Sequence, residues 1–201
     1  MAEESLAYLD FVHLVLEALG EGGVPYLIGG AVAAWAWGEP RATRDLDLVV
    51  RIPEEAVEQL SREFQKRDMQ LPPDIILARL EDDRGDVPLN VVHAATGYKA
   101  DLYLVRDEDS FRAEAFQRRI QVDLGPELGD VYLHTPEDLI LNKLMYYGMS
   151  QQSKHLRDIT AIVKTLGDDL DVEYLRLWVD EMGLQILWKN LQSHIRKSEE
   201  R

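Results

Sequence analysis

The sequence predicts an α/β region followed by a helical region, in a chain of 201 residues that is long enough for one large domain. Up to about residue 134, short apolar runs typical of strands alternate with segments of helical periodicity. From Thr135 onward, apolar residues recur at spacings of three and four, which is typical of helices. No long linker separates the regions. We therefore predict an α/β core over residues 1–134 and a helical region over residues 135–201 that packs on it.

The elements of the first region follow from periodicity and from turn residues. An amphipathic helix is expected over residues 3–19, where glycines stop it. Alanines favour a short helix over residues 31–37, and Pro53 opens another. Residues 108–118 are expected to be helical. Apolar or alternating runs predict strands over residues 24–28, 45–50, 75–80, 87–93, 99–105, 120–124 and 131–134.

The second region starts at a clear helix signal. Thr135 is suited to the N-cap, Pro136 to the first helical position, and two carboxylates follow in the first turn. Three apolar stripes then indicate further helices, beginning at Leu156, Val172 and Leu184. The methionines and tyrosines over residues 145–149 are expected to pack in the core.

Composition limits the classes of function. With 22 basic and 37 acidic residues the net charge is −15, which disfavours binding to nucleic acid or an anionic membrane unless one face is basic. Candidates for such a face are Arg112, Arg118 and Arg119, or the C-terminal Lys189, Arg196 and Lys197. The absence of cysteine excludes a thiolate metal site and a cysteine nucleophile. The five histidines show no zinc-hydrolase spacing, and no Walker A or Gly-x-Ser-x-Gly motif occurs.

No apolar run approaches the roughly 20 residues that cross a bilayer. The N-terminal sequence is too acidic for a secretory signal peptide. We therefore expect a cytoplasmic protein with no membrane association.

Three carboxylates stand in apolar strands, where aspartate is disfavoured. Asp45 and Asp47 are two residues apart, so their side chains share one face of a strand at about 6.6 Å along it. Asp101 lies in a second strand with apolar neighbours. Like charges placed so closely need neutralisation, and a divalent cation such as Mg²⁺, held by carboxylates, phosphate and water, supplies it. The three acids are therefore a candidate metal site.

A glycine pair precedes these acids. Gly29 and Gly30 lie between a strand and a helix, where glycine permits a sharp turn and a close approach to a ligand. The N–H groups at the start of the following helix attract anions such as phosphate. A phosphate cradle and metal ligands are therefore expected in one strand–helix–strand unit.

These residues resemble the nucleotidyltransferase superfamily, which is built on a palm like that of DNA polymerase β. The first match is Gly29-Gly30 followed by RATRDLDLVV over residues 41–50. The second is TPEDLILNKL over residues 135–144 with KHLRDI over residues 154–159. Both are similar to the abortive-infection and toxin–antitoxin nucleotidyltransferases of bacteria. The resemblance implies an α/β (α+β) fold with a small mixed sheet flanked by helices.

The resemblance also implies roles for single residues. Asp45 and Asp47 would hold Mg²⁺ or Mn²⁺, and Asp101 would join them and orient or deprotonate the attacking hydroxyl. Gly29 and Gly30 would seat the triphosphate of an NTP substrate. Further phosphate contacts would come from Arg41, Thr43, Arg44 and Lys143.

The implied reaction transfers a nucleoside monophosphate from an NTP to a hydroxyl. The acceptor hydroxyl could belong to a tRNA, a protein or a small cationic molecule, and the last two tolerate an acidic surface better. The alternative is a catalytically weak binding module that acts through a protein partner. In a toxin–antitoxin or phage-defence system, that partner would be the cognate toxin or antitoxin. The three acids favour the enzyme.

Overall fold

The structure, a computed structural model, describes residues 2–84 and 86–199, and the side chains of residues 8–84 and 86–195. The strands are β1 (Tyr26–Ile28), β2 (Asp45–Val50), β3 (Leu89–Val92), β4 (Lys99–Leu104), β5 (Ile120–Asp123) and β6 (Asp130–Leu133). They form one sheet in the order β3-β4-β2-β1-β6-β5. Strand β2 pairs antiparallel with β1 and parallel with β4, so the sheet is mixed. The predicted fold class is confirmed.

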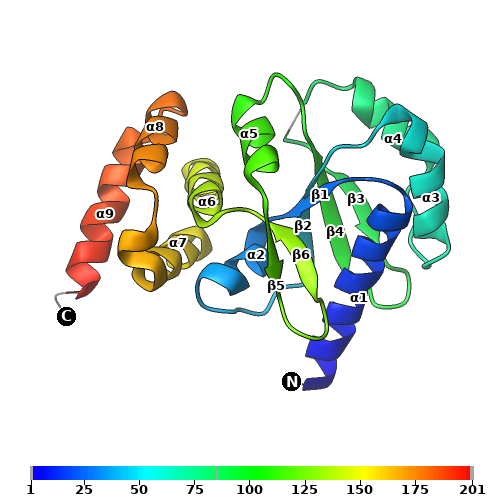
Figure 1. Ribbon diagram of the computed structural model, residues 1–201, viewed down its shortest axis with the longest axis horizontal. Helices are drawn as coiled ribbons and strands as arrows, with labels where there is room; N and C mark the ends of the chain where they lie inside the picture. Colours follow the sequence, from blue (N-terminus) through cyan, green and yellow to red (C-terminus); the bar gives the residue numbers. More distant parts are fainter. Residues whose placement is uncertain (1, 85, 200–201) are drawn as a thin grey trace.

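Helices precede, interrupt and follow the sheet (Figure 1). The helices are α1 (Ala2–Glu21), α2 (Gly30–Trp37), α3 (Val57–Gln65), α4 (Pro73–Glu81), α5 (Ser110–Arg118), α6 (Pro136–Ser150), α7 (Ser153–Leu166), α8 (Val172–Glu181) and α9 (Gln185–Glu199). Helices α1, α3 and α4 lie on one side of the molecule, and α6 to α9 form a group on the other. Single 3-10 turns span Glu54–Ala56 and Gly167–Asp169.

The strand expected over residues 75–80 is wrong, because this segment lies within helix α4. Pro73 occupies a first-turn position and Asp74 follows it, as at the start of many helices. Ile76 and Arg79 are buried, whereas Ile75 is 51% exposed. The apolar residues of this segment therefore lie around a helix of which only one side is buried. A short apolar run alone does not distinguish such a helix from a strand.

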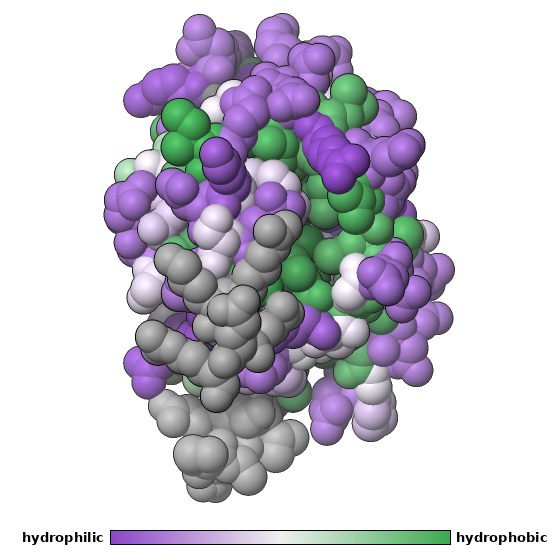
Figure 2. Space-filling model, turned by 90° about the vertical axis from the view of Figure 1, so that its left-hand side faces the viewer, coloured by the Kyte–Doolittle hydropathy of each residue, from purple (hydrophilic) through white to green (hydrophobic). Residues whose placement is uncertain are grey.

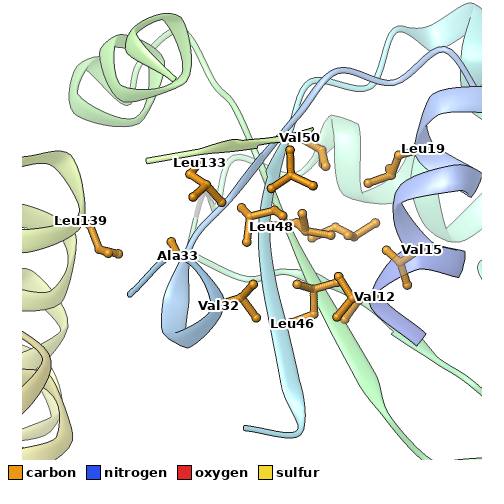
Figure 3. Close-up of a cluster of buried hydrophobic side chains, with 14 of the residues drawn as sticks. Val12, Val15, Leu19, Val32, Ala33, Leu46, Leu48, Val50, Leu133 and Leu139 are labelled. Atoms are coloured by element: carbon orange, nitrogen blue, oxygen red, sulfur yellow. The ribbon is translucent and has the colours of Figure 1, made fainter. Parts of the chain in front are cut away.

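The alternation along β2 separates the two faces of the sheet. Leu46, Leu48 and Val50 are buried on one face, where side chains from α1 and α2 meet them (Figure 3). Val49 faces the other way and packs with Leu27 and with Phe116 of α5 in a second, smaller cluster. Asp45 and Asp47 share the face of Val49, because side chains two residues apart in a strand point the same way. The first face is thus the main core, and the second is left for a site.

Buried carboxylates fix the start of helix α6. Thr135 is the N-cap, as predicted, with its hydroxyl 3.2 Å from the Asp138 amide that donates to it. The fully buried Asp138 accepts hydrogen bonds from the Tyr174 hydroxyl of α8 at 2.6 Å and from the Arg118 guanidinium of α5 at 3.4 Å. Glu137 accepts from the backbone N–H of Asp171 at 3.0 Å. Through these contacts α6 is tied to the sheet region and to the later helices.

The outer side of the C-terminal helices mixes polar and apolar surface. Figure 2 shows hydrophobic residues exposed between hydrophilic ones on this side. Exposed apolar side chains in this region include Leu177 of α8 at 56% and Ile186 of α9 at 77%. In the described part of the chain, no helix has the length and apolar character needed to cross a bilayer.

Replacing Asp138 with alanine should lower the free energy of unfolding by about 3 kcal/mol. The change leaves Arg118 and the Tyr174 hydroxyl without their buried acceptor, and such a loss is more costly than that of a surface ion pair. Urea unfolding followed by circular dichroism measures the difference. Asp107→Ala, at an exposed turn, is the matched control and should change stability by less than about 0.5 kcal/mol. Equal losses in the two variants would contradict this role for Asp138.

Candidate functional site

Two of the predicted acids lie side by side. Strands β2 and β4 run parallel, with Asp47 directly opposite Asp101. Side chains at paired positions point to the same face of a sheet, so both carboxylates lie on the face opposite the main core. Asp101 is buried at 8% exposure and accepts a hydrogen bond from the Asn90 amide of β3. The structure therefore places Asp101 beside Asp47.

Gly30 provides the space for the Asp47 carboxylate. A Cβ atom added to Gly30 would lie 1.9 Å from Asp47 Oδ2. Gly30 also has φ +57°, a backbone conformation that side-chain-bearing residues rarely adopt. Next to it, the Gly29 N–H donates to the Asp47 carbonyl at 2.8 Å. The glycine pair thus fixes both the backbone and the side chain of Asp47.

A cavity of about 250 Å³ opens where these residues meet. We call it the small cavity. Its lining includes Gly29, Gly30, Arg41, Asp47, Tyr103, Arg112, His134, Asn142, Lys143, Tyr146, Lys154 and His155. Helix α2 begins here without a side-chain N-cap. Its first-turn N–H groups therefore lie at this end of the cavity without a side-chain acceptor, as at anion-binding helix starts.

Lys143 and Arg41 meet at a single carboxylate. The buried Lys143 ammonium lies 2.7 Å from Asp158 Oδ2, and Arg41 Nε lies 3.2 Å from Asp158 Oδ1. Asp158 belongs to α7, Lys143 to α6, and Arg41 to the loop before β2. Two cations share one anion here, so the cluster carries a net positive charge beside Asp47. An incoming anion such as phosphate would be favoured.

Burial and neighbouring charges both shift the pKa values of Asp47 and Lys143. Burial raises the pKa of Asp47, Asp101 raises it further, and Lys143 lowers it. Burial likewise lowers the pKa of Lys143, whereas Asp158 raises it. Titratable groups perturbed in this way are concentrated at functional sites more often than elsewhere.

Asp45 lies apart from the other two acids. Its side chain is exposed, and Oδ1 lies 3.8 Å from the Lys99 ammonium. The same ammonium lies 2.8 Å from Asp101 Oδ2. Among the described residues, no three acidic or histidine side chains converge closely enough to hold a metal ion. As the side chains stand, Asp47 and Asp101 are adjacent, and Lys99 lies between Asp101 and Asp45.

Two predicted phosphate contacts lie outside the lining of the small cavity. The Thr43 hydroxyl donates to the backbone carbonyl of Asp45 at 3.0 Å, a contact that stabilises the chain entering β2. Arg44 is exposed at the same end of the strand. Arg41, Lys143 and the glycine pair do line the cavity, so the structure brings four of the six predicted nucleotide contacts to it.

Sequence reasoning missed several lining residues. Asn142 and Tyr146 lie with Lys143 on one face of α6, and their spacing of three and four is a signal that could have found them. His134 is buried, and both of its ring nitrogens lack a hydrogen-bond partner. Its position one residue before the N-cap of α6 gave no such signal. Burial, with Lys143 and Arg112 nearby, lowers the pKa of His134 to about 3.

A second and larger space adjoins the small cavity. This wide cleft of about 1130 Å³ lies between the sheet region and α6 and α8, and it shares Val49, Arg112, His134, Asn142 and Tyr146 with the small cavity. Six acidic side chains line it: Glu81, Asp83, Asp86, Glu108, Asp109 and Glu181.

Two arginines, Arg106 and Arg112, also line the wide cleft. Its apolar side chains include Met145, Met149 and Trp178. The expectation that residues 145–149 pack in the core is therefore wrong for Met149, which is 66% exposed, because this part of α6 faces the cleft. The cleft thus combines negative charge with an apolar surface.

Gly30→Ala should destabilise the protein more than Gly23→Ala. Both glycines have positive φ, which costs alanine about 1–2 kcal/mol, but nothing lies within 4 Å of a Cβ at Gly23. At Gly30 the added methyl group must also displace the Asp47 carboxylate. Thermal and urea unfolding of the two variants measure the difference. A Gly30→Ala variant as stable as Gly23→Ala would show that Asp47 does not depend on this space.

Stability should fall as pH is lowered from 6.5 to 5.5, in part through His134. The folded-state pKa of about 3 is below the usual 6.5, so the unfolded chain takes up the proton first and the contribution is lost as pH falls. One such group contributes about 1 kcal/mol over this interval. Between these two pH values, the free energy of unfolding of His134→Gln should therefore fall by about 1 kcal/mol less than that of the unsubstituted chain. Urea unfolding at both pH values measures the difference. The exposed His194→Gln is the control, and the same pH dependence in both variants would refute the assignment.

Comparison with known proteins adds evidence from folds alone. No family model matches the sequence, and no curated protein matches it. Solved structures do match. The solution structure of the antibiotic-resistance factor ANT(2'')-Ia aligns with a TM-score of 0.61 and 18% identity, over 96% of this chain and 99% of that one.

Two further structures agree. A crystal structure of ANT(2'')-Ia in complex with adenylyl-2''-tobramycin gives a TM-score of 0.55 and 17% identity, over 92% of this chain and 97% of that one. The crystal structure of an antigenic nucleotidyltransferase-like protein from Paracoccidioides brasiliensis aligns with a TM-score of 0.56 and 16% identity, over 94% of this chain and 93% of that one. At these identities the likeness shows the fold. The chain has the nucleotidyltransferase fold, which is the fold that the resemblance of its sequence implied.

Proposed function

We propose that this protein is a nucleotidyltransferase that moves a nucleoside monophosphate from an NTP to a hydroxyl group with the help of Mg²⁺ or Mn²⁺. The observation that carries the proposal is the placement of Asp47 opposite Asp101, beside a glycine turn and the Lys143–Arg41 pair. Asp47 and the cationic phosphate contacts line one cavity, and Asp101 lies opposite Asp47 on the neighbouring strand. The nucleotidyltransferase fold of the chain supports the same reaction class.

The donor set suits a hard divalent cation. Asp47 and Asp101 offer carboxylate oxygens from adjacent strands, and Mg²⁺ takes one or two carboxylates together with phosphate and water. Asp45, on the same face, becomes a ligand if its side chain leaves Lys99. When bound, the metal would neutralise charge on the attacking and leaving oxygens.

The chain's own residues position the reactants. The triphosphate would lie against the α2 N-terminus and Gly29-Gly30, with Lys143 and Arg41 as cationic contacts. Asp101 would orient the acceptor hydroxyl and receive its proton. The acceptor oxygen then forms a bond to the α-phosphorus, the bond from that phosphorus to the bridging oxygen breaks, and pyrophosphate leaves.

The wide cleft favours a small, cationic acceptor over a nucleic acid. Its six acidic side chains outnumber its two arginines, so the lining has a net negative charge that would repel phosphates and attract amines. It meets the small cavity at His134, Asn142 and Tyr146, where donor and acceptor must come together. ANT(2'')-Ia, whose structure with an adenylylated tobramycin matches this one, is a precedent for such an acceptor on this fold.

Three of the basic residues considered for tRNA binding are engaged elsewhere, whereas Lys189 is exposed on α9. Arg118 pairs with Asp138 and lies over the Tyr174 ring at 3.7 Å. Arg119 lies over Phe116 at 4.4 Å, and Arg112 pairs with Asp109 at 3.3 Å. The side chains of Arg196 and Lys197 lie outside the described part of the chain. A tRNA or protein acceptor, and a cognate toxin or antitoxin partner, stay as predictions from the sequence.

Asp47→Asn and Asp101→Asn should each reduce transfer at least about a hundredfold, because each removes a charged ligand and Asp101→Asn also removes the proton acceptor. The assay incubates the chain with each α-labelled NTP, Mg²⁺ or Mn²⁺, and one of three acceptor pools: polyamino sugars, tRNA, or protein. We expect label on the amino sugars. Circular dichroism checks that the variants fold.

Asp130→Asn is the matched control, because Asp130 is an exposed strand aspartate outside both cavities. It should retain full transfer. Label on tRNA or protein alone would overturn the choice of acceptor. An absence of transfer to every pool, with NTP still bound, would favour the binding-module alternative.

A further inference from the structure

Lys99 occupies one side of the carboxylate that the proposed reaction needs. Its ammonium lies 2.8 Å from Asp101 Oδ2 and 3.8 Å from Asp45 Oδ1. The other oxygen of Asp101, Oδ1, accepts from the Asn90 amide. Both oxygens of Asp101 therefore have a donor, and a cation that is to bind Asp101 through Oδ2 must take the place of the ammonium.

The position of Lys99 is fixed by the register of the sheet. Lys99 begins β4 directly opposite Asp45 of β2, two residues before Asp101 on the same face. A lysine here cannot avoid the acids unless its side chain extends into solvent. That movement is open to it, because the Lys99 side chain is 37% exposed.

We propose that Lys99 is a built-in counter-ion that a divalent cation must displace before Asp101 and Asp45 can bind it. The inference rests on the proposed metal site. In the metal-free protein, Lys99 neutralises part of the repulsion among the three acids. A free metal ion therefore meets an occupied site, whereas a metal bound to an NTP also gains the contacts of the triphosphate with Lys143 and Arg41. Metal and nucleotide then enter together.

The alternative, that Lys99 is an incidental surface ion pair, makes a different prediction. An exposed pair between side chains that water can replace contributes little energy. Removing it would change metal affinity only as much as removing any other positive charge from the surface.

The test measures Mn²⁺ binding to the full-length chain without nucleotide by electron paramagnetic resonance. Lys99→Met keeps the length of the side chain and removes the charge, so Mn²⁺ should bind at least about tenfold more tightly. Lys164→Met is the matched control, because Lys164 is exposed on α7 and the change in net charge is the same. Asp101→Asn should abolish the tight binding, which would place the ion at this site.

Equal affinities in the Lys99→Met and Lys164→Met variants would overturn the proposal, as would tight binding that survives Asp101→Asn. If Lys99→Met does not fold, Lys99→Gln serves in the same comparison. The readout is independent of transfer. A chain that transfers nothing to any acceptor still gives this result, and loss of the Lys99 effect leaves the transfer assay unaffected.

Discussion

The proximity of two carboxylates, Asp47 and Asp101, is the constraint on which the rest of the site depends. Parallel pairing of β2 and β4 places them opposite each other, and both are taken largely out of water. Like charges in such a place cost stability unless cations compensate, and Asp101 raises the pKa of Asp47. The nearby cations have this effect: Lys99 contacts one acid, and Lys143 lowers the pKa of the other. A divalent cation would compensate the negative charge of both carboxylates more fully, so the arrangement favours metal binding.

The buried ion pairs of the helical region hold the proposed phosphate contacts in place. Burial lowers the pKa of Lys143 and the Asp158 carboxylate raises it, and Asp158 also holds Arg41. This carboxylate joins α6, α7 and the loop before β2, while Asp138 joins α6 to α5 and α8. Helix α6 therefore presents Asn142, Lys143 and Tyr146 from a fixed position. The helical region completes the small cavity and does not merely cover the sheet.

The pattern of the sequence predicts much of this structure but not its side-chain partners. The alternation of polar and apolar residues over residues 45–50 predicts strand β2 and its two faces, and Thr135-Pro136 predicts the start of α6. Both predictions depend on local rules. The segment over residues 75–80 was predicted wrongly, since its environment is set by distant packing. The ion pair of Lys99 with Asp101 depends on strand register, which no local spacing encodes. The same holds for the close approach of His134 to Gly29, where an added Cβ would lie 3.3 Å from the imidazole ring.

The two spaces of the site differ in charge, and under the proposed function this difference would assign them to different substrates. The small cavity holds Arg41, Lys143 and the start of α2, all of which favour an anion. The wide cleft holds six carboxylates and two arginines around an apolar surface, and the excess of negative charge favours a cation. A polyanionic donor and a cationic acceptor would thus be sorted before any chemistry, and attraction between them would help at the junction near His134. An acceptor carrying phosphates would find no favourable net charge in the wide cleft and would compete with the NTP for the small cavity. Charge separation across one continuous site is therefore the feature that best distinguishes an acceptor with amines from a nucleic acid.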